Sequence, residues 1–377
     1  MTDLDRSDRI SPNALFPTPH NLRPTLRTDR ARVAVIGTGW WATATHIPGL
    51  VADPRAELVA LCDADPDRVK AAALAYGIER TYSDHRAMLA AERPDAVVVA
   101  TTHATHYVVA RDCLDAGAHL LIEKPMTLRA ADARELVETA ARIGSSIVIG
   151  YPWNYMSVAR LVRDRLASGE FGPIQFVQSA FNSYNADLLA GRDRSNRPGE
   201  YPVHGPGAVY SSKEHSGGGH GHLQITHAAG LLFYVTGLQP ARVQARMSSF
   251  GLPLDLADVM MVEFAGSALG TVSGTSNAFL PKSTLTIGCA NGSIELDVYA
   301  GSAVIRVANG NAETLPRMPD TDLRLAPLRN LVGIACGGEE NVSPPVVGWR
   351  AVELLDAAYR SAERGGQLVD IKELYEL

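Results

Sequence analysis

The chain has 377 residues, of which 46% are hydrophobic and 20% are charged, and its formal net charge is −6. This composition is typical of a folded globular protein, and the length favours two domains over one. The mild negative charge argues against a nucleic-acid or anionic membrane partner, and no apolar run reaches the roughly 18 residues of a membrane-spanning helix.

The first segment, residues 1–31, is polar, contains several prolines and lacks the apolar core of a signal peptide. We expect a flexible arm here, with an arm packed on a neighbouring subunit as the alternative. The cysteines are scattered without the spacing of a metal site or a redox pair; they are Cys62, Cys113, Cys289 and Cys336. The sequence therefore predicts free thiols, no metal site and a cytoplasmic location.

An apolar run at residues 33–36 leads into a glycine turn of the form G-T-G-W-W-A. In such a turn the first glycine permits the sharp bend, and the second lets the backbone approach a pyrophosphate at a helix N-terminus. The residues that we expect to contact a dinucleotide here are Gly37, Thr38, Gly39, Trp40 and Trp41.

A second apolar run ends at Asp63, 26 residues after Gly37. A carboxylate at this place hydrogen-bonds the adenosine ribose and repels a 2′-phosphate, which favours NAD over NADP. The alternative for Asp63 is to cap the N-terminus of the helix that follows.

Strand-like and helix-like segments alternate over residues 32–152, which predicts a doubly wound parallel sheet, a Rossmann domain. Ligands bind beyond the carboxyl ends of such strands. Polar side chains follow two of these ends, and we expect them to contact the cofactor; they are Thr101, Thr102, His103 and His106 after one strand, and Glu123 and Lys124 after the next. Ordinary loop histidines are the alternative for His103 and His106.

Lys124 ends a buried strand and is followed by a proline. An ammonium group is costly to remove from water, so it should contact something negative or rich in oxygen. One interpretation has Lys124 bind the substrate hydroxyl that loses a hydride. The other is a salt bridge to Glu123 or to an acid at the rim.

Residues 153–377 read as a second α/β domain with an open, mainly antiparallel sheet of strands joined by Gly- and Asn-containing turns. An amphipathic helix at residues 347–364 could pack back on the first domain. A long polar segment, residues 182–218, precedes the histidine-rich stretch "GGGHGHLQITH" at residues 217–227. Loops of that length are usually functional or disordered.

Four stretches together make the chain resemble the Gfo/Idh/MocA family of oxidoreductases (glucose–fructose oxidoreductase, inositol dehydrogenase and MocA); they are "VAVIGTGWWATATHIPGL", "LVALCDADPDR", "VVVATTHATHYVVARDCLDAGAHLLIEKPMTL" and "GGGHGHLQITHAAGLLFYVTG". The resemblance implies an N-terminal Rossmann domain and a C-terminal domain whose open sheet covers the active site and often mediates oligomers. It also implies that Lys124 is the catalytic lysine and His227 the active-site histidine. Asn154 would lie near the nicotinamide end of the cofactor.

One departure from the family pattern stands out. The family commonly has an aspartate four residues before the histidine, where this chain has Leu223, and a glycine two residues before it, where this chain has Ile225. A substrate-binding carboxylate is therefore missing, and His222 is a candidate to replace it as a polar partner. Other candidate substrate residues lie in the long loop; they are Tyr201, Tyr210 and Lys213, with Tyr184 and His204 as further members.

The histidines do not predict a zinc site. On α-helical geometry His220, Leu223 and His227 share one face, with a leucine between the imidazoles and no acidic or thiol third ligand. For His220 and His222 a structural role is as good an interpretation as a functional one. An imidazole at His227 titrates near neutral pH and suits proton transfer coupled to hydride transfer.

The sequence thus predicts an NAD-dependent dehydrogenase for a ring hydroxyl of a sugar, sugar derivative or cyclitol. A second hypothesis is a redox-neutral enzyme that keeps NAD bound and cleaves glycosides or epimerises sugars through a transient keto-sugar. A third is a non-catalytic NAD-binding regulator. A homodimer or homotetramer is expected, because an open sheet face is ordinarily buried by a partner.

Overall fold

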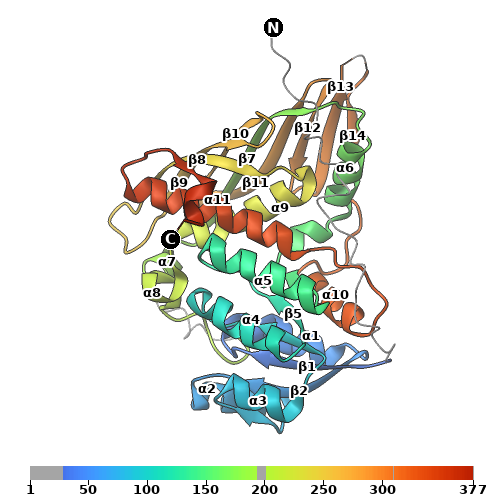
Figure 1. Cartoon of the computed structure of the whole chain (residues 1–377), viewed down its shortest axis with the longest axis vertical. Helices are drawn as coiled ribbons and strands as arrows, with labels where there is room; N and C mark the ends of the chain where they lie inside the picture. Colours follow the sequence, from blue (N-terminus) through green and yellow to red (C-terminus); the bar gives the residue numbers. More distant parts are fainter. Residues whose placement is uncertain (1–28, 193–200, 309, 377) are drawn as a thin grey trace.

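The computed structural model describes residues 29–192, 201–308 and 310–376 (Figure 1). Residues 1–28 of the predicted arm lie outside the described residues, and only its last residues, 29–31, are described. Two sheets organise the described residues, one in the lower and one in the upper half of the view in Figure 1, with α5, α9 and α11 between them.

The first sheet has six parallel strands in the order β3-β2-β1-β4-β5-β6. They are β1 (Ala31–Ile36), β2 (Ala56–Cys62), β3 (Thr81–Tyr82), β4 (Ala96–Val99), β5 (His119–Ile122) and β6 (Ile147–Ile149). The central strands are apolar on both faces because helices cover both sides. This is the strand order of a dinucleotide-binding Rossmann fold.

The helices of this half are α1 (Ile47–Ala52), α2 (Pro66–Tyr76), α3 (His85–Glu92), α4 (His106–Asp115) and α5 (Ala130–Ile143). A π-helix (Ala42–His46) follows the glycine turn, and a 3-10 turn (His103–Thr105) precedes α4. A helix from the end of the chain, α10 (Ala326–Ala335), also packs here, and its Leu328 and Leu331 share an apolar core with β1.

The second sheet has nine strands in the order β14-β13-β12-β11-β7-β10-β9-β8-β15. They are β7 (Ile174–Tyr184), β8 (Pro240–Ser248), β9 (Ala257–Phe264), β10 (Leu269–Thr275), β11 (Asn277–Cys289), β12 (Gly292–Asp297), β13 (Ser302–Val307), β14 (Glu313–Leu315) and β15 (Val369–Asp370). All neighbours pair antiparallel except β7 and β10, which are parallel. The predicted fold class, a Rossmann sheet followed by an open, mainly antiparallel sheet, is confirmed.

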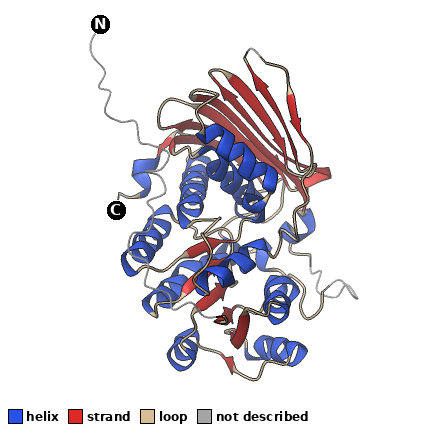
Figure 2. Ribbon diagram, turned by 90° about the vertical axis from the view of Figure 1, so that its right-hand side faces the viewer, coloured by secondary structure: helices blue, strands red, loops and turns tan. Residues whose placement is uncertain are grey.

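Helices cover one face of the nine-stranded sheet, and its other face is bare of helices (Figure 2). The covering helices are α6 (Ser157–Ala167), α9 (Thr226–Thr236) and α11 (Pro345–Glu363). The long helix α11 also contacts α5 and β6 of the first half, where Asp356 accepts a hydrogen bond from the backbone N–H of Ala130 (2.9 Å). It thereby fastens the two halves together.

The segment at residues 182–218 is less irregular than its composition suggests. Strand β7 runs on to Tyr184, and three short helical turns follow; they are α7 (Ala186–Leu189), a 3-10 turn (Val209–Ser211) and α8 (Lys213–Ser216). Two further 3-10 turns span Pro152–Tyr155 and Ile371–Leu374. Among the described residues, no helix is both long enough and apolar enough to cross a membrane.

Candidate active site

The glycine turn after β1 has the open backbone that a pyrophosphate needs. Gly37 has φ +91°, and a Cβ there would lie 2.4 Å from the carbonyl oxygen of Ala100, so only glycine fits. At Gly39 a Cβ would meet nothing closer than the Arg68 guanidinium, at 3.9 Å. These features fit NAD in the manner of a Rossmann fold.

Asp63 lies beside this turn at the end of β2. Its Oδ2 accepts hydrogen bonds from the backbone N–H (2.7 Å) and the hydroxyl (3.1 Å) of Thr38. The N-terminus of α2 is capped by Asp65 instead, which accepts from the backbone N–H groups of Asp67 and Arg68. The capping alternative for Asp63 is therefore wrong, and its carboxylate shapes the turn.

The carboxylate of Glu123, at the end of β5, is a hydrogen-bond partner of two side chains from the glycine turn and the π-helix that follows it. Trp41 donates its indole N–H to Oε1 (2.9 Å), and His46 Nε2 lies 2.8 Å from the same oxygen. Burial works to raise the pKa of Glu123, but the His46 contact, the Lys124 charge and the Trp41 hydrogen bond lower it to about 2. Glu123 is thus a fixed negative charge under the predicted cofactor turn.

The alternative role of Lys124 was a salt bridge, and its ammonium forms none with the residues that the structure describes. Its Nζ donates to the backbone carbonyl of Leu223 (3.0 Å). This hydrogen bond connects the end of β5 with the histidine-rich turn. Burial lowers the pKa of Lys124, and the charge of Glu123 opposes that shift. The amine is therefore easier to deprotonate than a lysine in water.

His227 occupies an aromatic pocket in the first turn of α9. Its ring centroid lies 5.4 Å from that of Trp153, 6.1 Å from Tyr151 and 6.4 Å from Phe181. Burial and the nearby Lys124 charge hold the pKa of His227 well below its usual value, so the imidazole is neutral at pH 7. Lys124 and His227, predicted from motifs about 100 residues apart, thus interact electrostatically in one place.

The run of glycines before His227 is explained by two side chains that clamp it. The carboxylate of Asp255 accepts from the backbone N–H groups of Gly219 (2.7 Å) and Gly221 (2.9 Å), and the Tyr359 hydroxyl donates to the same carboxylate (3.1 Å). A Cβ on Gly219 would lie 2.1 Å from the Asp255 carbonyl oxygen, and one on Gly218 would lie 2.2 Å from the Tyr359 hydroxyl. Glycine is needed at these positions because Asp255 and Tyr359, which we call the clamp, lie too close to leave room for a Cβ.

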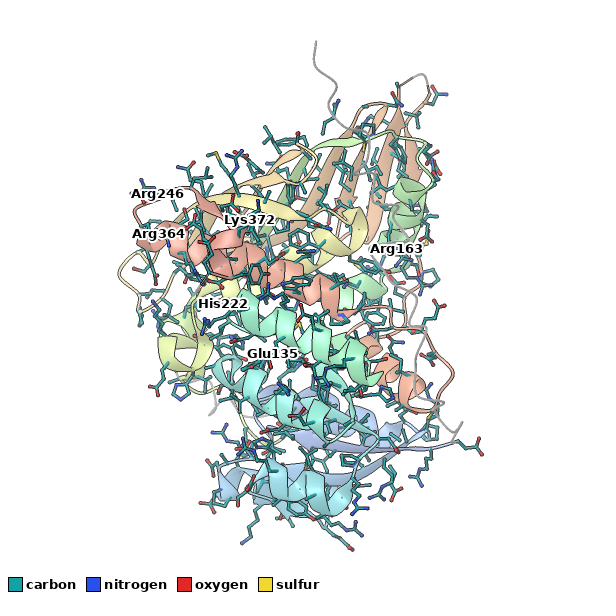
Figure 3. All side chains as sticks on the ribbon, in the orientation of Figure 1. Glu135, Arg163, His222, Arg246, Arg364 and Lys372 are labelled. Atoms are coloured by element: carbon teal, nitrogen blue, oxygen red, sulfur yellow. The ribbon has the colours of Figure 1, made fainter. Side chains whose placement is uncertain are left out.

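The expected helical stripe of His220, Leu223 and His227 is wrong, because Gly221–Ile225 forms a π-helix before α9 begins. The wider turn sends the three side chains to different places. His220 Nδ1 lies 2.7 Å from the Ser276 hydroxyl, whereas His222, labelled in Figure 3, stacks on Tyr359 with ring centroids 4.5 Å apart.

Leu223, where the family pattern has an acid, contributes its backbone to the site. Its side chain packs into a small apolar cluster with Leu188, Leu189 and Leu256, while its carbonyl holds Lys124. This position therefore supplies an acceptor for the lysine although it lacks a carboxylate.

A segment of the long loop, residues 201–216, crosses the carboxyl ends of three Rossmann strands, and we call it the strap. Tyr210 accepts a hydrogen bond from the Trp40 indole (3.1 Å), and the Tyr201 ring lies edge-on to Trp40 at 5.9 Å. His204 Nε2 lies 3.3 Å from the Arg68 carbonyl, and His103 Nδ1 lies 2.9 Å from the Ser216 carbonyl. The strap thus touches the loop after β1, the first turn of α2 and the 3-10 turn after β4.

The other predicted site residues differ in how far they are exposed to solvent. Thr101 and Thr102 are partly exposed after β4, with the Thr105 hydroxyl 2.9 Å from that of Thr101. His106 is fully buried against the carbonyl of Pro125 (2.8 Å) and Asn154 against the hydroxyl of Ser343 (3.1 Å). Lys213 is exposed and pairs with Glu363 on α11 (2.9 Å).

Sequence reasoning missed the side chains that support the site from a distance. They are His46, Tyr151, Trp153, Phe181, Asp255 and Tyr359. His46 lies in the first of the four family-like stretches but was not singled out, the others lie outside those stretches, and the clearest hint was the glycine run itself, which required a close neighbour. In the described parts of the chain no group of three or more His, Cys, Asp or Glu side chains could hold a metal ion.

Gly219→Ala should lower the free energy of unfolding by at least about 2 kcal/mol, because the clamp must open to admit the methyl group. Urea denaturation measures the loss. Gly338→Ala is the matched control, since a Cβ there meets nothing within 4 Å. Equal stabilities of the two variants would contradict the clamp.

Two family models match the chain. Residues 31–151 match the oxidoreductase family with an NAD-binding Rossmann fold (GFO/IDH/MocA), and residues 159–295 match the GFO/IDH/MocA C-terminal domain. Residues 152–158, which lie between the two sheets in the chain, separate the two matches.

Curated relatives match over part of their length. D-apiose dehydrogenase of Paraburkholderia graminis is 35% identical over 174 residues, which is 45% of this chain and 46% of that protein. D-glucoside 3-dehydrogenase of Escherichia coli is 30% identical over 153 residues, or 41% of this chain and 44% of that protein. The alignments thus span about half the length of these relatives.

Solved structures match over nearly the whole chain. The structure of GenD2 from gentamicin A biosynthesis, in complex with NAD, is 25% identical, covers 92% of this chain and 98% of that chain, and has a TM-score of 0.72. The predicted cofactor, NAD, is confirmed by the Rossmann family match and by neighbours crystallised with it. The chain belongs to the Gfo/Idh/MocA family of NAD-binding oxidoreductases.

Proposed function

We propose that this chain is an NAD-dependent dehydrogenase that transfers a hydride between a ring hydroxyl of a sugar, sugar derivative or cyclitol and the nicotinamide. The observation that carries the proposal is that the Lys124 amine, which follows the carboxyl end of β5, lies within electrostatic range of the His227 imidazole. Both groups have lowered pKa values, and neither is used up by a salt bridge among the described residues. The names of the two curated relatives support a carbohydrate substrate.

The chemistry divides between the cofactor and these side chains. NAD, when bound, supplies the hydride acceptor. The Lys124 amine takes the hydroxyl proton; its lowered pKa favours the unprotonated form that can do so, and the Leu223 carbonyl fixes its position. The neutral His227 imidazole accepts a hydrogen bond from the reacting or the adjacent hydroxyl, and Trp153 offers an aromatic face to the ring.

Lys124→Met should lower kcat by at least about 100-fold, because the general base is lost while the side chain keeps its length. The affinity for NAD should stay within about tenfold, since the glycine turn and Asp63 are unchanged. Steady-state kinetics and NAD titration measure the two effects. Lys70→Met, an exposed lysine on α2, is the control, and near-normal turnover of Lys124→Met would remove the lysine from the mechanism.

A redox-neutral enzyme that retains NAD and acts through a transient keto-sugar is the second candidate. The strap favours it, because its contacts to the loop after β1, to the first turn of α2 and to the 3-10 turn after β4 would have to break before a dinucleotide could leave. In that case each catalytic cycle ends with the hydride returned to the sugar.

Tyr210→Phe should speed NAD release about fivefold, because the strap loses its hydrogen bond to Trp40, worth about 1 kcal/mol. Stopped-flow displacement of bound NADH, followed through tryptophan fluorescence, gives the rate. Tyr184→Phe, an exposed tyrosine of β7, is the control. An unchanged release rate would show that the strap does not retain the cofactor.

A substrate panel separates the candidate functions. The purified protein is incubated with NAD and with sugars, cyclitols and aryl glycosides, while NADH absorbance and released product are followed together. NADH formed in step with product supports the dehydrogenase. Glycoside cleavage or epimerisation without net NADH supports the redox-neutral enzyme, and NAD binding without any turnover would favour a regulator.

The bare face of the nine-stranded sheet supports a homo-oligomer. Four large apolar side chains on β7, β9 and β10 are about half exposed there; they are Phe176, Val259, Met261 and Leu269. We expect Met261→Asp to shift the protein toward monomers in analytical ultracentrifugation, because a buried charge weakens an apolar interface. A wild-type protein that is already monomeric would contradict this proposal.

A further inference from the structure

Asp258, at the start of β9, is a buried acid without a donor. It is 1% exposed, and neither of its carboxyl oxygens receives a hydrogen bond from a described residue. Its side chain lies on the face of the sheet that carries the buried Met260 and Val262. An ionised carboxylate in such a place costs much free energy unless it is paired with a cation or a donor, so an unpaired one is expected to hold a proton.

The ionisable neighbours of Asp258 provide no positive charge. Asp255, three residues earlier, is the charged group that acts on it, and Tyr359 on α11 lies within electrostatic range. His220 and His222, on the turn that Asp255 clamps, have pKa values lowered by burial to about 4, so both are neutral at pH 7. Burial and the Asp255 charge together hold the pKa of Asp258 well above its usual value.

We propose that Asp258 carries a proton that it shares with Asp255, and that this acid–carboxylate pair holds the glycine turn of the active site in shape. Asp255 is then the charged member, and it accepts from Gly219, Gly221, Tyr359 and the Asp258 carboxyl. Two interacting carboxyl groups in a buried place share one proton because both cannot ionise together. The shared proton also supplies the donor that Asp258 otherwise lacks.

The pair acts on the active site through the backbone. The clamped glycines lead directly into the π-helix, whose Leu223 carbonyl binds the Lys124 amine and whose His222 stacks on Tyr359. Loss of the shared proton would place two negative charges behind the turn and push Asp255 away from Asp258. Asp258 is therefore a positioning residue, and it touches neither the reacting atoms nor the cofactor turn.

The pH dependence of stability tests the shared proton without any substrate. The folded protein keeps a proton on Asp258 that the unfolded chain releases above about pH 4. The buried histidines act in the opposite direction in the wild-type profile, because the unfolded chain protonates them below about pH 6.5. The contribution of Asp258 is therefore the difference in Tm between a variant and the wild type, measured from about pH 5 to about pH 8. Asp258→Asn carries a neutral donor at every pH, so its Tm should exceed that of the wild type by a margin that grows over this range.

The control is Asp67→Asn, an exposed acid on α2, whose Tm difference from the wild type should stay constant. Carbon-13 NMR of aspartate-labelled wild-type protein adds a measurement that needs no variant. One aspartate carboxyl should remain protonated at pH 7. A constant Tm difference for Asp258→Asn, or a fully ionised set of aspartates at pH 7, would overturn the proposal.

The activity measurement rests on the proposed function, and the two tests above do not. Asp258→Leu keeps the branched shape of the side chain but removes the donor, and we expect kcat to fall at least about tenfold with KM changed by less than about threefold. Asp258→Asn should restore most of that loss. The Asn and Leu variants could lose activity equally while the stability test gives the expected result. That outcome would support the shared proton and contradict its effect on the active site.

Discussion

The hydrogen bond from the Lys124 amine to the Leu223 carbonyl joins the two halves of the molecule at the point where chemistry is proposed. One partner ends a strand of the Rossmann sheet, and the other lies in a π-helix that leads into a helix of the second sheet. A half-buried amine needs an acceptor, and here that acceptor is neutral rather than charged. The amine therefore keeps a lowered pKa that a salt bridge to an acid would have raised.

That arrangement accounts for a departure from the family pattern. A leucine stands where an aspartate is common, yet the position still takes part through its carbonyl. The side chain contributes to an apolar wall with Leu188, Leu189 and Leu256. The carboxylates around the site lie in two other places. Glu123 lies under the cofactor turn, and the Asp255–Asp258 pair lies behind the glycines. The active site combines a basic pair, aromatic rings and few acids.

Much of the fold could be predicted from the sequence because its features are local. The apolar runs before Gly37 and Lys124 and the strand–helix alternation led to the Rossmann sheet, which is confirmed along with the family and NAD. The roles of Lys124 and His227 stay predictions, although the structure brings the two residues together. The long-range contacts could not be predicted, since Asp255 and Tyr359 lie in no motif and, like His46, meet their partners only after folding. The helical stripe was wrong because a π-helix cannot be distinguished from an α-helix by residue spacing alone.

The central claim is that Lys124 removes a proton from a ring hydroxyl as its carbon gives a hydride to NAD. A single-turnover experiment tests it most directly. The NAD-loaded protein is mixed with the sugar or cyclitol that it turns over, deuterated at the reacting carbon, and NADH absorbance is followed as a function of pH. The account predicts slower NADH formation with the deuterated substrate, and a rate that rises with pH to a plateau below the pKa of lysine in water, about 10.4. A rate without an isotope effect and without this rise, or no NADH at any pH while product forms, would contradict it.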